Sequence, residues 1–165
     1  MKDMQTFYYD TLEQVDISIY IVATDKGLSY VKRHLEAVEK LHPEAKFIHD
    51  EAKIAVYKQQ LIEYFDQKRE TFDLPYDIQI GTTFQRSVWD ALLTIPYGET
   101  VSYADIGEKI NNPKAVRAIG NANGKNPISI IIPCHRVVQK DGKLGGYSSG
   151  LDMKRYLLQL EQDDD

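Results

Sequence analysis

Hydrophobic and polar positions alternate along the first part of the chain. Between residues 5 and 30 the apolar side chains recur at a spacing of about two, which is typical of β-strands; they are Phe7, Tyr9, Val15, Ile17, Ile19 and Ile21. The polar stretch 24–27 interrupts the alternation and ends in glycine, as turns often do. The pattern predicts paired strands joined by a hairpin turn, and therefore a small antiparallel sheet.

A helical period replaces the alternation after residue 50. Up to residue 69 the apolar positions fit one stripe of a helix, and they are Ile54, Val56, Tyr57, Leu61, Ile62, Tyr64 and Phe65. Residues 71–81 contain the step Leu74-Pro75 and end in glycine, which indicates an extended linker. We therefore predict an N-terminal domain over residues 1–81 and a second domain over residues 82–165.

The second domain opens with helical patterns. Thr83 is placed to cap a helix that Pro96 ends, and Ser102 is placed to cap a short helix over residues 103–110. A tight turn and another helix, over residues 114–121, follow. Two short helices around a tight turn form a helix-turn-helix pattern, whose second helix faces DNA in many regulators. The same geometry is also a common way to pack helices, so both interpretations stay open.

The remaining pattern completes the fold class. The β-branched run 128–133 predicts a buried strand ended by proline. A glycine-rich turn over 141–150 and a helix over 151–161 follow. We predict an α/β protein of the mixed α+β kind, with a small N-terminal antiparallel-sheet domain and a helical C-terminal domain that carries the helix-turn-helix.

Composition narrows the setting of the protein. The 165 residues are 42% hydrophobic and 27% charged, as in ordinary globular proteins. No apolar run approaches the roughly 18–20 residues that span a bilayer, and the start of the chain is too polar for a secretory signal. One cysteine supports neither an internal disulfide nor a cysteine-rich zinc site. We expect a cytoplasmic monomer with no membrane partner, no metal and no cofactor.

The charge distribution bears on a nucleic-acid partner. The net charge of −5 argues against one, because phosphate binding depends on Lys and Arg. The stretch 109–155, however, has nine basic residues against Asp141 and Asp152. This local excess fits either a solvated face or a DNA-binding surface.

Cys134 is the candidate for chemistry. A lone cysteine is more often a small buried hydrophobe than a nucleophile. Here it ends the predicted strand, with His135 next to it and the glycine-rich turn close behind, which is a setting for an activated thiol. Adjacent side chains of a strand point to opposite faces. Contact between the two residues must therefore come from a turn or a bridging water.

Four ordered motifs resemble one known family. The run from Pro133 to Val137, Pro-Cys-His-Arg-Val, resembles the active-site motif of the O6-alkylguanine-DNA alkyltransferases. Residues 95–103, 112–120 and 145–161 match further motifs of that family in order. The resemblance covers residues 82–161, whereas residues 1–81 resemble the family's variable N-terminal domain only in size and pattern.

The resemblance implies a reaction and roles for five residues. A member of this family repairs O6-alkylguanine, and O4-alkylthymine, in double-stranded DNA, as a single-turnover methylated-DNA–protein-cysteine methyltransferase. It flips the base out and transfers the alkyl group irreversibly to Cys134. His135 takes the thiol proton through a water, and Glu161 orients the imidazole. Tyr103 assists the leaving oxygen, and Asn126 is the hinge between the DNA-binding helix and the active-site loop.

The resemblance also implies a DNA surface and a substrate pocket. Arg117 is the finger that replaces the flipped base, and small residues let its helix approach the minor groove closely. The DNA-binding set is Arg117, Lys114, Ala115, Ala118, Gly120 and Lys125. The pocket set, besides Cys134, is Val137, Tyr147, Ser148 and Ser149.

Two positions depart from the commonest family pattern, and rival functions exist. Ser129 stands where proline is frequent, and Ser149 replaces a glycine at the edge of the pocket, which bears on the size of alkyl group admitted. The zinc ligands of some members' N-terminal domain have no counterpart. The alternatives are a non-catalytic alkylguanine-binding protein, a cysteine hydrolase built on Cys134 and His135, and a helix-turn-helix regulator.

Overall fold

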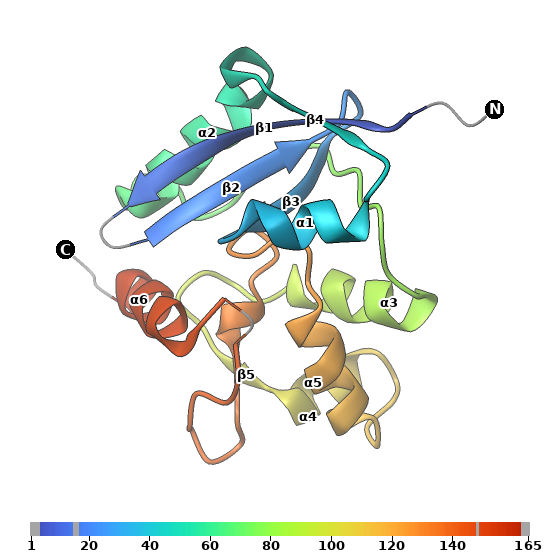
Figure 1. Ribbon diagram of the computed structural model, residues 1–165. Helices are drawn as coiled ribbons and strands as arrows, with labels where there is room; N and C mark the ends of the chain where they lie inside the picture. The colour runs from blue at the N-terminus through green and yellow to red at the C-terminus, as the bar shows by residue number, and fades with distance from the viewer. Residues whose placement is uncertain (1–3, 15–16, 148, 163–165) are drawn as a thin grey trace. The chain divides into compact units, whose positions relative to one another are not determined.

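A four-stranded sheet forms the centre of the first of two units (Figure 1). The computed structural model describes residues 4–14, 17–147 and 149–162, and the chain divides into the units Met1–Gln79 and Ile80–Asp165. The strand order is β3-β2-β1-β4. The strands are β1 (Thr6–Gln14), β2 (Ile17–Ala23), β3 (Leu28–Lys32) and β4 (Lys46–His49).

The predicted antiparallel sheet is confirmed, with one addition. β2 pairs antiparallel with both β1 and β3, and the predicted hairpin turn joins β2 to β3. At that turn the Thr24 N–H donates to the Gly27 carbonyl at 2.9 Å. β4 was not predicted, and it pairs parallel with β1. Val15, assigned to the alternating stretch, lies outside the described residues.

Two helices accompany the sheet. α1 (Leu35–Leu41) was not predicted, whereas α2 (Glu51–Phe65) lies within the predicted helix and packs on β1 and β2. Asp50 caps α2 by accepting a hydrogen bond from the Lys53 N–H. Most of the predicted apolar stripe is buried, but Val56 is 62% exposed, because its position falls between the turns that face the sheet.

The segment predicted as a linker belongs largely to the first unit. The Pro75 carbonyl accepts from the Leu28 N–H at 2.9 Å, and the Asp77 N–H donates to the Leu28 carbonyl at 2.8 Å. The segment therefore extends the edge of the sheet beside β3. Gly27 makes room for it, because a Cβ at this position would lie 2.8 Å from the backbone of Pro75.

Short helices dominate the second unit, and most of its predicted elements are present. They are α3 (Thr83–Leu92), β5 (Val101–Ser102), α4 (Tyr103–Lys109), α5 (Val116–Gly124), a 3-10 turn (Cys134–Arg136), β6 (Val137–Val138) and α6 (Leu151–Gln162). α3 packs on α4 and α5 (Figure 1). No helix among the described residues is both long and apolar enough to cross a membrane.

The observed ends of α3, α4 and α5 agree only in part with the predicted caps and bounds. Ser102 caps α4 as predicted, by accepting from the Asp105 N–H in a capping box. The cap of α3 is Thr82, not Thr83, because the capping box needs Gln85 three residues later. The helix predicted over 114–121 begins at Val116 and ends at Gly124. Its start is delayed because a turn, with the Ala115 N–H donating to the Asn112 carbonyl, comes first.

The prediction of a strand over 128–133 is wrong. The run is buried, but it forms consecutive turns in which Ile130 has a φ of 74°, a left-handed value that a strand does not allow. Asn126 stabilises these turns: its Nδ2 donates to the Ile132 carbonyl at 2.8 Å, and its Oδ1 accepts from the Ile128 N–H at 3.0 Å. A buried apolar run looks the same in either conformation, so the period could not reveal the turns.

Gly27→Ala should destabilise the first unit. The added Cβ meets backbone atoms, which cannot move aside like the end of a side chain, so we expect a loss of about 2 kcal/mol in the free energy of unfolding. Urea denaturation of both forms measures it. Gly124→Ala is the control, since apart from its neighbours in the chain and the backbone of its own helix no atom lies within 4 Å of the added Cβ. A loss at Gly27 no larger than the change at Gly124 would contradict the close approach.

Candidate active site

Cys134 begins the 3-10 turn and is 1% exposed. Its backbone N–H donates to the Ile132 carbonyl at 2.8 Å. Cys134 and His135 are thus neighbours in a tight turn and not in a strand, which is one of the two arrangements that the sequence left open. His135 and Arg136 complete the turn, and both are buried.

Glu161, from α6, connects this turn to the rest of the unit. One carboxylate oxygen lies 2.6 Å from His135 Nε2 and accepts from Arg136 Nη2 at 3.1 Å. The other accepts from Arg136 Nε at 2.8 Å, and from the Gly98 N–H at 3.3 Å. The predicted proximity of Glu161 and His135 is present. The bidentate pair with Arg136 was not predicted, because Arg136 was counted as part of a basic surface.

The protonation states follow from these contacts. Burial would raise the pKa of Glu161, but hydrogen bonds from His135 and Arg136 outweigh it and lower the pKa to about 2. Burial lowers the pKa of His135, although the bond to Glu161 opposes the shift. A neutral imidazole beside an ionised carboxylate carries its proton on Nε2. The buried Nδ1 has no hydrogen-bond partner in the protein, so it is free to accept a proton.

Two tyrosines lie near the Cys134 thiol. Burial raises the pKa of Tyr103, the charge of a Cys134 thiolate raises it further, and a side-chain hydrogen bond with Asn123 partly offsets the increase. Burial, followed by the charge of Cys134, raises the pKa of Tyr147 well above its usual value. Both phenols therefore stay protonated and can donate hydrogen bonds beside the sulfur.

Asn123 was missed by the sequence analysis. It lies on the inner side of α5, 4% exposed, and its Nδ2 donates to the Cys134 carbonyl at 3.3 Å. Its position in the sequence gave one weak signal, since it shares a helical face with Ile119. A polar residue on that face does not by itself indicate a contact with Cys134.

Lys154 is the second residue, after Arg136, that was assigned to the predicted basic surface but is buried. It is fully buried, and its Nζ donates to the carbonyls of Val137 at 2.8 Å, Gly146 at 3.3 Å and Leu144. Burial lowers its pKa to about 8. Lys154 and Arg136 thus stabilise the interior, and the exposed basic residues of the stretch are Lys109, Lys114, Arg117, Lys125, Lys140, Lys143 and Arg155.

The predicted DNA-binding residues lie in and around α5. Arg117 and Ala118 are exposed on this helix, while Gly120 and the preceding Ala115 are partly exposed. Lys114 and Lys125 are exposed just before and just after α5. The opposite side of the helix is buried, and the Ala122 carbonyl accepts there from Trp89 Nε1 at 2.8 Å. The helix therefore has one anchored face and one free face.

The predicted pocket residues are only partly described. Val137 is buried in β6, where it pairs with Val101. Ser149 is partly exposed, and its hydroxyl lies 3.3 Å from that of Ser129. The two departures from the family pattern therefore touch each other. Ser148 lies outside the described residues.

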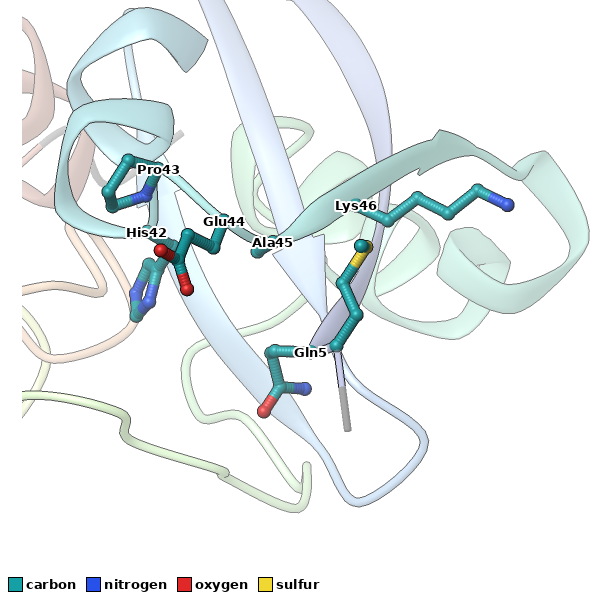
Figure 2. Close-up of a pocket in the computed structure, with 7 residues that line it drawn as sticks. Gln5, His42, Pro43, Glu44, Ala45 and Lys46 are labelled. Atoms are coloured by element: carbon teal, nitrogen blue, oxygen red, sulfur yellow. The ribbon is translucent and has the colours of Figure 1, made fainter. Parts of the chain in front are cut away.

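Two features of the first unit offer no comparable chemistry. A pocket there is lined by residues 4–5 and 42–46 (Figure 2), and its His42 is bonded to the Tyr30 hydroxyl at 2.7 Å. Asp10, His49 and Glu51 form the one metal-ligand-like group among the described residues. Lys58 Nζ already lies 3.1 Å from Asp10, and its charge disfavours a cation there.

Comparisons with known proteins match both units. The family model for the ribonuclease-like domain of 6-O-methylguanine DNA methyltransferase matches residues 7–78, and the model for its DNA binding domain matches residues 83–163. The methylated-DNA–protein-cysteine methyltransferase of Methanosarcina barkeri is 46% identical over 94% of this chain and 97% of its own length. The inducible methylated-DNA–protein-cysteine methyltransferase of Bacillus subtilis is 42% identical over 95% of this chain and 91% of its own length.

Solved structures agree with these relatives. The crystal structure of Mycobacterium tuberculosis O6-methylguanine methyltransferase has a TM-score of 0.83 and 40% identity, over 96% of each chain. The M. tuberculosis protein OGT in complex with DNA has a TM-score of 0.83 and 41% identity, over 95% of this chain and 92% of that one. The predicted mixed α+β fold is therefore confirmed.

Glu161→Gln should destabilise the second unit by about 3–5 kcal/mol, because it leaves the buried Arg136 guanidinium without a carboxylate.

Acid should weaken the same contact between Glu161 and its partners. The pKa of Glu161 is about 2 in the fold, against an ordinary value of 4.5. A carboxyl group whose pKa is lowered by folding stabilises the fold at pH values above its pKa in the unfolded chain. About 3 kcal/mol of the free energy of unfolding is therefore lost as the pH falls from about 4.5 to about 2. Chemical denaturation across this pH range measures both effects.

The control for this prediction is Glu63→Gln. Glu63 pairs with Arg69 at 2.8 Å, but both side chains are partly exposed, so this change should cost less than about 1 kcal/mol. Arg136→Met added to Glu161→Gln should recover part of the loss, since it removes the stranded charge. Equal effects of Glu161→Gln and Glu63→Gln would show that the buried network contributes no more than a surface pair.

Proposed function

The chain belongs to the 6-O-methylguanine DNA methyltransferase family, and from this membership we propose that it removes the alkyl group of O6-alkylguanine in double-stranded DNA and keeps it on Cys134. Its activity is the transfer of alkyl groups from DNA to a cysteine of the protein itself. One observation carries the choice of Cys134. It is the only cysteine, and it lies beside His135, which is bonded to Glu161.

The proposed reaction is a single displacement. The Cys134 thiol gives its proton, through a water, to the unpartnered Nδ1 of His135, and Glu161 stabilises the imidazolium that forms. The sulfur then bonds to the alkyl carbon while the bond from that carbon to O6 breaks. Its electron pair stays on the guanine, where the Tyr103 hydroxyl donates a hydrogen bond to the developing negative charge. The imidazolium holds the proton that the base recovers.

The product limits each chain to one turnover. Cys134 becomes a thioether, which neither water nor a thiol displaces readily. The reaction is therefore stoichiometric and irreversible, and the chain is consumed by it. Methyl groups on O4 of thymine offer the same carbon–oxygen bond to the sulfur, so we include O4-alkylthymine among the substrates.

DNA handling is assigned to the free face of α5. The small residues Ala115, Ala118 and Gly120 let the helix approach the minor groove, and Lys114 and Lys125 contact phosphates. The damaged base is flipped into the site, because Cys134 is buried and cannot reach a base inside the duplex. Arg117, exposed at the start of the helix, fills the gap left in the stack.

The substrate pocket is assigned to the residues around Cys134. The backbone at Cys134 and Val137, with Ser148, reads the edge of the guanine. Tyr147 closes the pocket, and Ser149 borders the alkyl group. Because the substrate is DNA and the thiol must stay reduced, we place the reaction in the cytoplasm. One chain supplies every proposed residue, so we propose that it acts as a monomer.

Cys134→Ser should abolish transfer while lesion binding stays within about twofold, because the hydroxyl fills the same space but ionises far less readily. The protein is incubated with excess duplex DNA that carries one O6-methylguanine, and its intact mass is followed. The wild-type chain should gain one methyl group and no more. A second methyl group, or turnover of the excess DNA, would contradict the single-use reaction.

Arg117→Ala should separate DNA handling from chemistry. On the duplex, loss of about 2 kcal/mol of stabilisation of the flipped state should slow repair roughly 30-fold. The free base O6-benzylguanine needs no flipping, so its reaction should change by less than about threefold. Single-turnover rates on both substrates give the comparison. An equal loss of rate on both substrates would mean that Arg117 supports the fold. Unchanged rates on both would mean that it is only a phosphate contact.

A further inference from the structure

Asn123 connects the proposed DNA-binding helix directly to the backbone of the nucleophile. It belongs to the last turn of α5 and is almost fully buried. Its Nδ2 donates to the Cys134 carbonyl at 3.3 Å. The same helix exposes Arg117 on its other side. One rigid element therefore carries both a residue assigned to the DNA and a residue bonded to Cys134.

A second observation marks this amide as part of the site. Asn123 Oδ1 and His135 Nδ1 are buried side-chain polar atoms that have no hydrogen-bond partner among the described residues. Both belong to residues in contact with Cys134 or next to it in the chain. An unpartnered buried polar group costs free energy, and native structures retain few of them, often at functional sites. Asn123 therefore behaves like the residues that surround the chemistry, and not like an ordinary core amide.

The amide also reaches Tyr103. Its side-chain hydrogen bond with Tyr103 lowers the pKa of that phenol, against the effects of burial and of the Cys134 charge. Asn123 thus touches the two groups between which the reaction is proposed to occur, the sulfur's own residue and the donor to the leaving oxygen.

Nearby contacts give the amide little freedom to move. The carbonyl of the preceding Ala122 accepts from the buried Trp89. Asn126, three residues later, is bonded to the turns at Ile128 and Ile132. Asn126 therefore positions the segment before the nucleophile, and Asn123 contacts the nucleophile itself. The end of α5 is anchored on both sides of the bond to Cys134.

We propose that Asn123 is a positioning residue that holds Cys134 and Tyr103 in register with α5, so that docking of this helix on DNA places the flipped base between them. The inference rests on the proposed function. It assigns Asn123 a contribution to the rate of alkyl transfer, and not to the affinity for DNA, because its side chain is buried beneath the helix.

Asn123→Leu, which preserves size and removes both polar atoms, is the first test. The limiting single-turnover rate should fall about tenfold on duplex DNA and on free O6-benzylguanine alike. The Kd for a duplex with O6-methylguanine should stay within about twofold. Gln159→Leu is the matched control, since it replaces an exposed amide on α6, and its rates should equal those of the wild type.

Asn123→Asp separates positioning from packing. The shape is kept, but the carboxyl loses the donor to the Cys134 carbonyl and gains a charge when it ionises beside the sulfur. Relative to the wild type, its transfer rate should fall progressively as the pH rises from 5 to 9, on the order of tenfold across the range. A residue that only fills space would give a loss that is independent of pH. This variant also decides the question if Asn123→Leu does not fold.

The outcomes separate this inference from the proposed function. If the wild-type chain takes up no alkyl group from O6-methylguanine DNA, the proposed function itself fails. If the wild type reacts and folded Asn123→Leu reacts at the same rate, the inference alone is overturned. It is also overturned if Asn123→Leu weakens duplex binding while the rate at saturation is kept, or if the loss in Asn123→Asp does not depend on pH.

Discussion

The buried carboxylate of Glu161 is the constraint on which the site depends. A charge removed from water must be paired and hydrogen-bonded, and here His135, Arg136 and the Gly98 N–H satisfy it together. These contacts tie α6 to the turn that carries Cys134 and to the loop after α3. The network that joins these three segments therefore also orients His135, whose burial lowers its pKa and whose Nδ1 has no hydrogen-bond partner in the protein.

Pairing of buried charges also changes how the basic residues are used. Arg136 donates hydrogen bonds to Glu161, and Lys154 donates to the carbonyls of Val137 and Gly146. Neither is available to phosphate. In this protein with a net charge of −5, the exposed basic residues in or next to α5 are Lys114, Arg117 and Lys125. Close approach by small residues is a way to bind DNA that does not require a strongly basic face.

α5 has different tasks on its two sides. Its outward side exposes Arg117, while its inward side is held by Trp89 and by the amide bond from Asn123 to Cys134. The turns after α5 depend on Asn126, which supports the left-handed Ile130. Because Asn123 donates a hydrogen bond to the Cys134 carbonyl, a displacement of α5 would also move the backbone at Cys134.

The sequence by itself determined the features that depend on neighbouring residues: the hairpin before β3, the capping of α4 by Ser102, the stripe of α2, and the motif around Cys134. Local patterns carry these because turns, caps and periodic faces are encoded within a few residues. Only the tertiary structure decided the turns at 128–132, the burial of Arg136 and Lys154, and the role of Asn123. The partners of Asn123 and Arg136 lie 11 to 41 residues away, whereas the turns at 128–132 depend on Asn126, two to six residues away. A charge or an apolar run reads the same in sequence whether it meets water or a buried partner.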